Sequence, residues 1–409
     1  MAITLARDLR PDMRWLSSGF VLTFCSCFGQ TYFIALFAGY LKAEITISDG
    51  MFGSLFTAGT IASAALLMWA GKFADQVPIR WLGAAVLAGL ALTALAMASL
   101  TSAWMLLLVF FGLRFFGQGM LTHVAMTAMG RWFNQKRGRA VSIAALGYPA
   151  SEALLPLIAV ATIGLIGWRM TWVAIAALLL LVALPLFVGL LQRERRPTKE
   201  HADGGTAPAP ARRDWTRNEV LKNPIFYALM PVLMGPGFLL TGIFFNQIAI
   251  ADTKGWNIAW FATNFPVMAG CNVVSALAAG WLTDRFGARH LLPVLLAPLG
   301  LAILLLTYME SPYVLTAFMI VVGFTLGSAS TVHGALWAEI YGTEHLGAIR
   351  AVVMSVAVFA SALSPALIGL LMDSGVGVDA LLLAGAAYCG VAAAWTVTLI
   401  PRLNRLAKG

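Results

Sequence analysis

The sequence has 409 residues, of which 60% are hydrophobic and only 11% are charged. A soluble domain carries about 25% charged residues, so this composition excludes a soluble globular protein and a disordered chain. The formal net charge of +9 suits either a nucleic-acid binder or a membrane protein, and the positions of the basic residues distinguish the two.

Twelve apolar runs are long enough to cross a bilayer, which takes about 20 helical residues. They are continuous rather than alternating, which indicates helices and not the strands of a membrane barrel. The four cysteines fall inside these runs, and we expect them to be free thiols. The predicted spans are 15–41, 51–70, 81–100, 104–128, 139–165, 170–191, 226–251, 258–280, 288–308, 313–337, 348–372 and 378–400.

Basic residues are concentrated in alternate loops, and this distribution sets the orientation of the chain. Of the 27 lysines and arginines, 23 lie on the side that holds both termini and the long middle loop. Lys42, Arg169 and Lys254 lie on the other side, and Arg114 lies inside a span. Both termini are therefore expected in the cytoplasm. Topology and contact with anionic lipid account for the net charge, so we expect no nucleic-acid partner.

One long polar stretch, residues 192–222, divides the sequence into two parts. It is rich in Pro, Ala, Gly and charged residues, which is typical of a flexible linker. Thr216 and Glu219 near its end have the spacing of a helix capping box, although a turn of irregular loop fits the same residues. We predict an N-terminal six-helix bundle over 1–191, a cytoplasmic linker over 192–222 and a C-terminal six-helix bundle over 223–409.

The two parts repeat one another at an offset of 209 residues. Both parts begin in the cytoplasm, so the repeat is parallel. Parallel halves are typical of transporters that rock about a site at the middle of the membrane. The matched positions are Gly71 and Gly280, Asp75 and Asp284, Arg80 and Arg289, Gly138 and Gly347, and Pro156 and Pro365.

The loop after the eighth span resembles the G-x-x-x-D-R-x-G-x-R loop of the major facilitator superfamily. It reads Gly280-Trp-Leu-Thr-Asp284-Arg285-Phe-Gly287-Ala-Arg289, and a copy that departs at Gln76 and Pro78 follows the second span. Arg114-Phe-Phe-Gly117-Gln118-Gly119 resembles the intramembrane arginine motif of that superfamily. The resemblance covers the whole chain. It implies an all-α membrane protein with twelve transmembrane helices in two pseudo-symmetric six-helix bundles.

The same resemblance implies a conformational latch at the two loops, with ordinary positive-inside charges as the alternative. Glu339 and Arg350, at the boundary of the tenth and eleventh spans, are expected to form a cytoplasmic gate pair or to be separate interfacial charges. The gating candidates are Gly71, Asp75, Arg80, Gly280, Asp284, Arg285, Arg289, Glu339 and Arg350.

A narrower resemblance concerns monocarboxylate and oxalate–formate porters. It rests on Trp132-Phe133-Asn-Gln-Lys136-Arg137-Gly138-Arg-Ala140, followed by Gly147-Tyr-Pro149. Those families hold carboxylates with basic residues in the eighth and eleventh helices, whereas 258–280 and 348–372 contain basic residues only at a boundary. The pattern therefore favours a monocarboxylate over a dicarboxylate, and it leaves a proton-driven exporter of apolar drugs or metabolites as the alternative.

In this fold the first, fourth, seventh and tenth helices line a central cavity, as the resemblance implies. Polar and aromatic residues recur at helical spacing on each of them, which suits a small amphipathic solute. Aromatic packing between helices is the alternative for any single Phe, and a hydrogen bond between helices is the alternative to proton sensing for His123 and His333. Phe37 and Phe245 are expected to meet as an outer gate. The substrate-binding candidates are Gln30, Phe33, Phe37, Arg114, Gln118, Thr241, Phe245, Ser330 and His333.

Arg114 and Glu152 are the full charges well inside the predicted spans. A charge at the bilayer centre costs at least about 2.5–3.5 kcal/mol, which makes each a functional candidate. At 1.5 Å per residue both lie roughly 22–24 Å from the cytoplasmic surface on consecutive helices, so we expect an ion pair. If an anionic substrate takes Arg114, the carboxylate left behind binds a proton, which couples one proton to one anion. A static structural pair is the alternative.

The sequence therefore predicts a secondary active transporter that moves a small, monocarboxylate-like organic anion with a proton by rocker-switch alternating access. No G-x-x-x-x-G-K-[ST] nucleotide loop occurs, and we expect no cofactor, no metal and no catalytic residue. A membrane receptor and an intramembrane enzyme are remote alternatives. We expect a multi-pass monomer in the bilayer of the plasma (bacterial inner) membrane.

Overall fold

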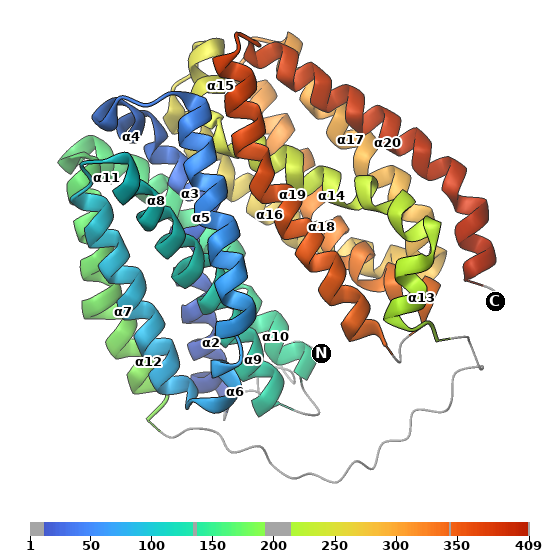
Figure 1. The fold of residues 1–409 in the computed structure, drawn as a ribbon, viewed down its shortest axis with the longest axis horizontal. Coiled ribbons are helices and arrows are strands. Elements are labelled where there is room, and N and C mark those ends of the chain that lie inside the picture. The colour runs from blue at the N-terminus through green and yellow to red at the C-terminus, as the bar shows by residue number, and fades with distance from the viewer. Residues whose placement is uncertain (1–11, 134–136, 193–213, 343–344, 408–409) are drawn as a thin grey trace. The chain divides into compact units, whose positions relative to one another are not determined.

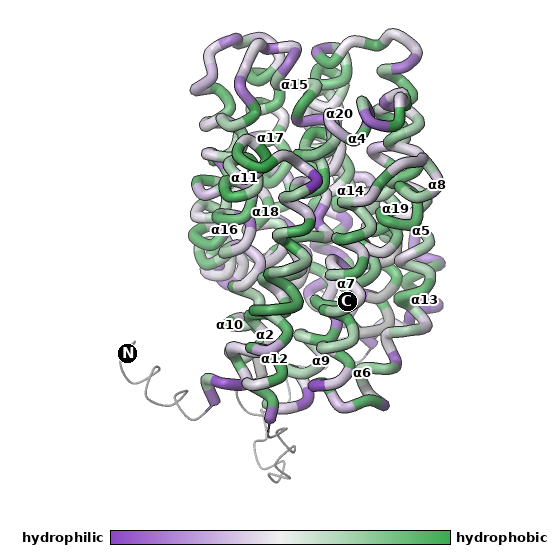
Figure 2. The backbone as a smooth tube through the Cα atoms, turned by 90° about the vertical axis from the view of Figure 1, so that its left-hand side faces the viewer, coloured by the Kyte–Doolittle hydropathy of each residue, from purple (hydrophilic) through white to green (hydrophobic). Residues whose placement is uncertain are grey.

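The computed structural model describes residues 12–133, 137–192, 214–342 and 345–407, and every regular element in these ranges is a helix (Figure 1). Helices suit these sequences because a lipid environment offers no hydrogen-bond partner, so backbone groups must pair within the segment. Figure 2 shows hydrophobic residues along most of each helix and hydrophilic residues mainly near the ends. The four cysteines are free thiols, as predicted.

The chain separates into two compact units, Met1–His201 and Ala202–Gly409. Their division falls within the predicted linker, and residues 193–213 of that linker lie outside the described residues. The domain limits at 191 and 223 stay a prediction.

The first unit begins with a bent span followed by five further crossings. Its elements are α2 (Met13–Cys25), η2 (Ser26–Gly29), α3 (Thr31–Ile34), η3 (Ala35–Phe37), α4 (Ala38–Ile45), α5 (Asp49–Ala70), α6 (Phe73–Gln76), α7 (Ile79–Ala98), α8 (Ala103–Gly112), η4 (Leu113–Leu121), α9 (Thr122–Trp132), α10 (Arg137–Ala145), α11 (Gly147–Leu178), η5 (Leu179–Ala183) and α12 (Leu184–Leu190).

The second unit has two short helices and six long ones in its described residues. Its elements are α13 (Arg217–Lys222), α14 (Pro224–Phe245), α15 (Gln247–Lys254), α16 (Ile258–Phe286), α17 (Ala288–Tyr308), α18 (Tyr313–Tyr341), α19 (Leu346–Asp373) and α20 (Val378–Leu406). Pro156 lies inside α11 and Pro365 inside α19, while Arg80 and Arg289 lie in the first turns of α7 and α17. These two pairs of matched positions are thus equivalent in the two units.

Twelve membrane crossings follow from the described helices. Ten helices are long and apolar enough to span a bilayer, and the bent pair Met13–Gly29 and Thr31–Ile45 makes an eleventh. One of the ten, Ala140–Leu190, has 51 residues, which is about 76 Å of helix against a hydrocarbon core of about 30 Å. It is interrupted at Gly167, where φ is 80°, so it crosses twice. The predicted number of spans is confirmed.

The end of the predicted linker folds onto the second unit. Thr216 and Glu219 form a capping box at the start of α13, so the irregular-loop alternative is wrong. The Trp215 amide donates to the Tyr341 carbonyl at 2.9 Å, and the two rings lie 5.5 Å apart. The segment 214–222 therefore packs as part of the C-terminal unit.

Candidate functional site

The first span breaks at Gln30, where α2 and η2 meet α3 at an angle of 47°. Gln30 is extended, with φ −83° and ψ 147°. The neighbouring Gly29 packs against the backbone of the fourth span, and a Cβ there would lie 2.2 Å from the Leu113 carbonyl oxygen and 2.8 Å from the Gly117 Cα. Glycine at both positions lets the two backbones touch at the break.

Arg114 closes the hydrogen-bond gap that the break creates. In an unbroken α-helix the Phe33 amide would donate to the Gly29 carbonyl, but here it donates to the Gln30 carbonyl at 3.2 Å. Arg114 Nη1 donates instead to the Gly29 carbonyl at 3.1 Å and to Thr31 Oγ1 at 3.3 Å. The Arg114 Cζ also lies 5.2 Å from the centre of the Phe56 ring. A buried cation is thus held by neutral dipoles and a ring face.

A second edge of the Arg114 guanidinium has no hydrogen-bond partner in the described chain. Nε of Arg114 is buried and has no hydrogen-bond partner among the described residues. In that part of the chain Nη1 alone makes hydrogen bonds, so Nη2 is also available. Nε and Nη2 together form the fork that binds a carboxylate through both oxygens. Arg114 lies in the π-helical segment η4, and π-helical turns occur frequently at functional sites.

Glu152 does not pair with Arg114, so the predicted ion pair is wrong. Glu152 is 2% exposed on α11, and its Oε2 has no hydrogen-bond partner among the described residues. It interacts electrostatically with Cys27 and Tyr148. The first span packs against both η4 and α11, and each side chain turns to a different part of it. Helix rise gives the depth of a residue but not its direction around the helix axis.

Tyr148 is a site residue that the sequence argument did not select. It lies one turn before Glu152 on α11, and its ring makes an edge contact with Tyr32 at 6.5 Å. It interacts electrostatically with both Arg114 and Glu152, and its hydroxyl makes no hydrogen bond within the described ranges. Tyr148 lies four residues before Glu152 and therefore on the same face of the helix, and this spacing could have identified it from the sequence.

Four further predicted site residues lie in the first unit. Gln30 is 7% exposed at the break itself, and Gln118 is partly buried in η4. Phe33 and Phe37 pack in the aromatic core, with ring centres 5.9 and 4.9 Å from that of Trp172. Within this unit, the contacts of Phe33 and Phe37 are those of aromatic packing, the alternative given above to lining a cavity. The gate between Phe37 and Phe245 joins two units and stays a prediction.

The remaining cavity candidates belong to the second unit. Thr241 is partly buried and Phe245 is buried on α14. On α18, Ser330 is exposed and donates to the Gly327 carbonyl at 2.8 Å, while His333 is partly buried. A shared cavity between these residues and Arg114 stays a prediction.

The first latch loop is held by the fourth span. The His123 Nε2 lies 3.0 Å from the Gly71 carbonyl oxygen, a hydrogen bond between helices, which is the alternative given above to proton sensing. Arg131 Nη1 donates to the Ala74 carbonyl at 2.6 Å, and the Arg80 guanidinium lies over the Trp81 ring. Asp75 lies in α6, and its side chain is outside the described residues.

The second latch loop is held by a carboxylate of the tenth span. Glu339 accepts a hydrogen bond from the Ala288 amide at 2.6 Å and pairs with Arg289. Its partner in the described chain is therefore Arg289 and not Arg350, which corrects the predicted gate pair. Glu339 lies at the first turn of α17, where the helix dipole favours a negative charge.

Other residues of the second loop make few contacts within its unit. Asp284 and Arg285 are exposed, with the Arg285 guanidinium 5.4 Å from the Trp281 ring. A Cβ at Gly280 would meet no atom within 4 Å, so Gly280 is not at a close helix contact among the described residues.

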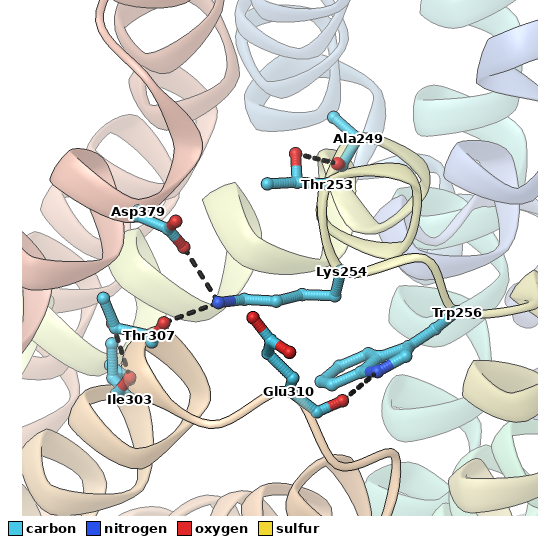
Figure 3. A network of polar contacts seen from close by, with 8 residues as sticks. All are labelled: Ala249, Thr253, Lys254, Trp256, Ile303, Thr307, Glu310 and Asp379. Carbon is cyan, nitrogen blue, oxygen red and sulfur yellow. Dashed lines mark hydrogen bonds and ion pairs between the residues drawn. The ribbon is translucent and has the colours of Figure 1, made fainter.

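The three basic residues of the outer side are all paired with carboxylates. Lys254 lies 3.1 Å from Asp379 and donates to the Thr307 carbonyl at 2.5 Å (Figure 3). Arg169 lies 2.7 Å from Glu44 and donates to the Ala98 carbonyl at 3.0 Å. The third pair is Lys42 with Asp49. These cations are engaged in structure, which leaves Arg114 as the cation inside a span that has no carboxylate partner in the described chain.

Comparison with known sequences identifies relatives along the whole chain. The sequence model described as Major Facilitator Superfamily matches residues 19–278 and 264–409. The chain is 24% identical over 357 residues to an MFS transporter, asaE, of Aspergillus flavus, which covers 83% of this chain and 76% of that protein. It is 22% identical over 400 residues to the oxalate:formate antiporter of Oxalobacter formigenes, with 95% and 91% of the two chains covered.

Solved transporter structures share the fold at low sequence identity. A bacterial homologue of the human lysosomal transporter Spinster, inward-facing and unoccupied, superposes with a TM-score of 0.73 at 14% identity and covers 96% of this chain and 97% of that one. The nucleoside transporter NupG gives a TM-score of 0.68 at 16% identity and covers 97% and 99%. These likenesses establish the fold and leave the substrate to the chemistry of the site.

Proposed function

The chain belongs to the major facilitator superfamily: it is a multi-pass membrane protein and a secondary transporter rather than an enzyme. From this premise we propose that it moves a small organic anion with one carboxylate, together with a proton, by rocker-switch alternating access. We place it as a monomer in the plasma (bacterial inner) membrane. The Oxalobacter relative is an oxalate:formate antiporter, which is in keeping with a carboxylate substrate.

The unpaired guanidinium of Arg114 is the observation that carries the proposal. An ion enclosed in a protein interior loses several kcal/mol of hydration unless a counter-charge replaces it. The described partners of Arg114 are a carbonyl, a hydroxyl and a ring, and none of them is anionic. A substrate carboxylate on the free Nε–Nη2 edge would supply the missing charge and two hydrogen bonds.

One buried cation favours one carboxylate. Arg114 is the single Lys or Arg well inside the twelve predicted spans, and the outer cations are engaged by Asp49, Glu44 and Asp379. The second carboxylate of a dicarboxylate would remain without a counter-charge in an apolar site. A monocarboxylate meets no such penalty.

Charge balance supplies the coupling to protons. With no substrate, Arg114 and an ionised Glu152 together carry no net charge. An anion alone leaves one negative charge in the span, and a proton alone leaves one positive charge. Because a net charge at the bilayer centre is costly, the empty form and the form with both anion and proton are favoured to change conformation. Symport and anion exchange both follow from this rule without a direct Arg114–Glu152 pair.

Transport in proteoliposomes tests the proposal against apolar export. Radiolabelled lactate and pyruvate should accumulate when a pH gradient, acidic on the side of substrate addition, is the driving force. Collapse of the gradient with a protonophore should abolish the accumulation. If the same vesicles take up neither acid and instead expel a lipophilic dye, the exporter alternative replaces the proposal.

A further inference from the structure

We propose that Thr31 is a positioning residue for the substrate, which holds Arg114 so that its Nε–Nη2 edge meets the carboxylate. This inference rests on the proposed function and assigns a role to the break in the first span. Thr31 does not contact the anion itself. It acts through the guanidinium that the anion binds.

The division of donors on Arg114 gives the geometry. A guanidinium has five N–H donors in a rigid planar fork. Both donors of Nη1 have acceptors, since they face the Gly29 carbonyl at 3.1 Å and Thr31 Oγ1 at 3.3 Å. The group is planar, so fixing Nη1 on two acceptors also fixes the direction of the opposite edge.

The break in the first span provides both acceptors. The Gly29 carbonyl is available because Gln30 is extended and Phe33 bonds elsewhere. Thr31 is the first residue of α3, directly after the break, and its side chain is partly buried. A straight helix would use the Gly29 carbonyl internally and leave Arg114 one fixed acceptor fewer. The bent form of the span is thus the form that binds the anion.

A buried donor without a partner supports an anion at the Nε edge of Arg114, and a buried acceptor on another helix supports a separate position for a proton. Arg114 Nε and Glu152 Oε2 are both enclosed without hydrogen-bond partners among the described residues. The parent residues are 4% and 2% exposed. Buried polar atoms without partners are rare in proteins, and a ligand absent from the structure is one recognised explanation.

Substitution of Thr31 provides the test. Thr31→Val keeps the shape of the side chain but removes the acceptor for Nη1, whereas Thr31→Ser keeps a hydroxyl. Hydrogen bonds to charged groups contribute about 1.5–3 kcal/mol, so Thr31→Val should raise the KM for lactate about tenfold or more. The kcat and the pH dependence of transport should change much less. Thr31→Ser should restore most of the affinity.

A matched control lies on the same span. Ser18→Ala removes a hydroxyl that bonds to the Trp15 carbonyl of its own helix and should leave the KM unchanged. We call the two hydrogen bonds from Arg114 Nη1 to Gly29 and Thr31 the clamp. Hydrogen exchange of a peptide over residues 26–37, measured without substrate, reports the clamp independently of transport. Exchange should rise in Thr31→Val and in Arg114→Gln.

Each outcome bears on a different claim. An unchanged KM in Thr31→Val, or a Thr31→Ser variant as weak as Thr31→Val, overturns the positioning role. Unchanged hydrogen exchange in Thr31→Val contradicts the clamp whatever the substrate is. Wild-type protein that shows the clamp but takes up no monocarboxylate contradicts the proposed function and the carboxylate part of this inference with it.

Discussion

Two buried charges of the first unit, Arg114 and Glu152, have different surroundings. Arg114 turns to the break in the first span, where it has neutral partners and a free edge. Glu152 has a buried Oε2 without a hydrogen-bond partner among the described residues and interacts electrostatically with the Cys27 thiol, which the Tyr32 hydroxyl contacts at 3.1 Å. Tyr148 interacts with both charges. On the proposed function, these residues provide two separate positions, one for an anion and one for a proton, linked by the cost of a net charge.

Replacing Glu152 tests that link. Glutamine resembles the protonated carboxyl and cannot release a proton, so the anion-loaded Glu152→Gln protein stays neutral while the empty protein keeps an uncompensated Arg114. We expect accumulation driven by a pH gradient to fall to background, with exchange of labelled for unlabelled lactate retained, because exchange needs no release of the proton. Counterflow and gradient-driven uptake measure the two activities in the same vesicles.

The same substitution at Glu219 is the control for Glu152→Gln. Glu219 accepts from the Thr216 amide at 2.8 Å in the capping box of α13, and glutamine serves equally well at that position of the box. Glu219→Gln should leave both activities intact. Persistent accumulation against a gradient in Glu152→Gln, with pH as the sole driving force, would remove Glu152 as the proton carrier.

At the scale of elements, the two units use equivalent positions with opposite charges. Adding 210 to Glu44 and Arg169 gives Lys254 and Asp379, and both pairs join the end of the first span to the start of the sixth. In each unit the cation also caps the third helix, through the Ala98 carbonyl in one and the Thr307 carbonyl in the other. Cations at a helix C-terminus are favoured by its dipole.

A charge exchange in the first unit tests this equivalence. Glu44→Lys or Arg169→Asp alone places like charges together, and each should lower the free energy of unfolding by about 1 kcal/mol, the scale of an exposed pair. The double variant copies the arrangement of Lys254 and Asp379 and should recover most of the loss. Thermal unfolding in detergent measures the three variants. A double variant less stable than both single ones would contradict the structural equivalence.

The latch loops show the same exchange of charge. Arg131 at the end of α9 donates to a carbonyl of the first loop, and Glu339, 208 residues later, accepts from an amide of the second. Each loop is thus fastened to the fourth helix of its own unit. The helix end that is held determines the charge of the side chain that holds it. A C-terminus offers carbonyl acceptors to a cation, and an N-terminus offers amide donors to a carboxylate.

At the scale of the whole molecule, we expect Asp284 to act in closure rather than in binding. It is exposed within its unit, which leaves its carboxylate for a partner outside that unit. Asp284→Asn should lower the transport rate about tenfold or more, the effect of losing a charged hydrogen bond, with the Kd for lactate little changed. Asp75→Asn is the matched comparison and should do less, since its loop departs from the motif at Gln76 and Pro78. Weakened binding with an intact rate would contradict the latch.

The limits of the spans were predictable because bilayer thickness imposes a length of apolar helix on the sequence. The spans predicted at 288–308 and 51–70 appear as α17 (Ala288–Tyr308) and α5 (Asp49–Ala70). The capping box at Thr216 was also predictable, because it depends only on residues that are close in the sequence. Contacts between helices were not predictable in this way, since they depend on the rotation of each helix about its axis.

The break at Gln30 illustrates what local rules leave out. No proline marks it, and it arises where Gly29 and Gly117 bring two backbones together. Arg114 then bonds to that break rather than to Glu152, and Glu339 bonds to Arg289 rather than to its sequence neighbour Arg350. In each case a backbone group left unpaired by tertiary structure determined where a charged side chain turned.

Direct titration of the anion onto the purified protein is the sharpest test of the central claim, that Arg114 binds the carboxylate through a free fork. Calorimetry should show lactate binding to the wild-type protein, with affinity reduced about tenfold to hundredfold in Arg114→Lys, which keeps the charge but loses the planar edge. The Ser18→Ala variant should bind as the wild type does. Equal affinities in wild type and Arg114→Lys would contradict the account.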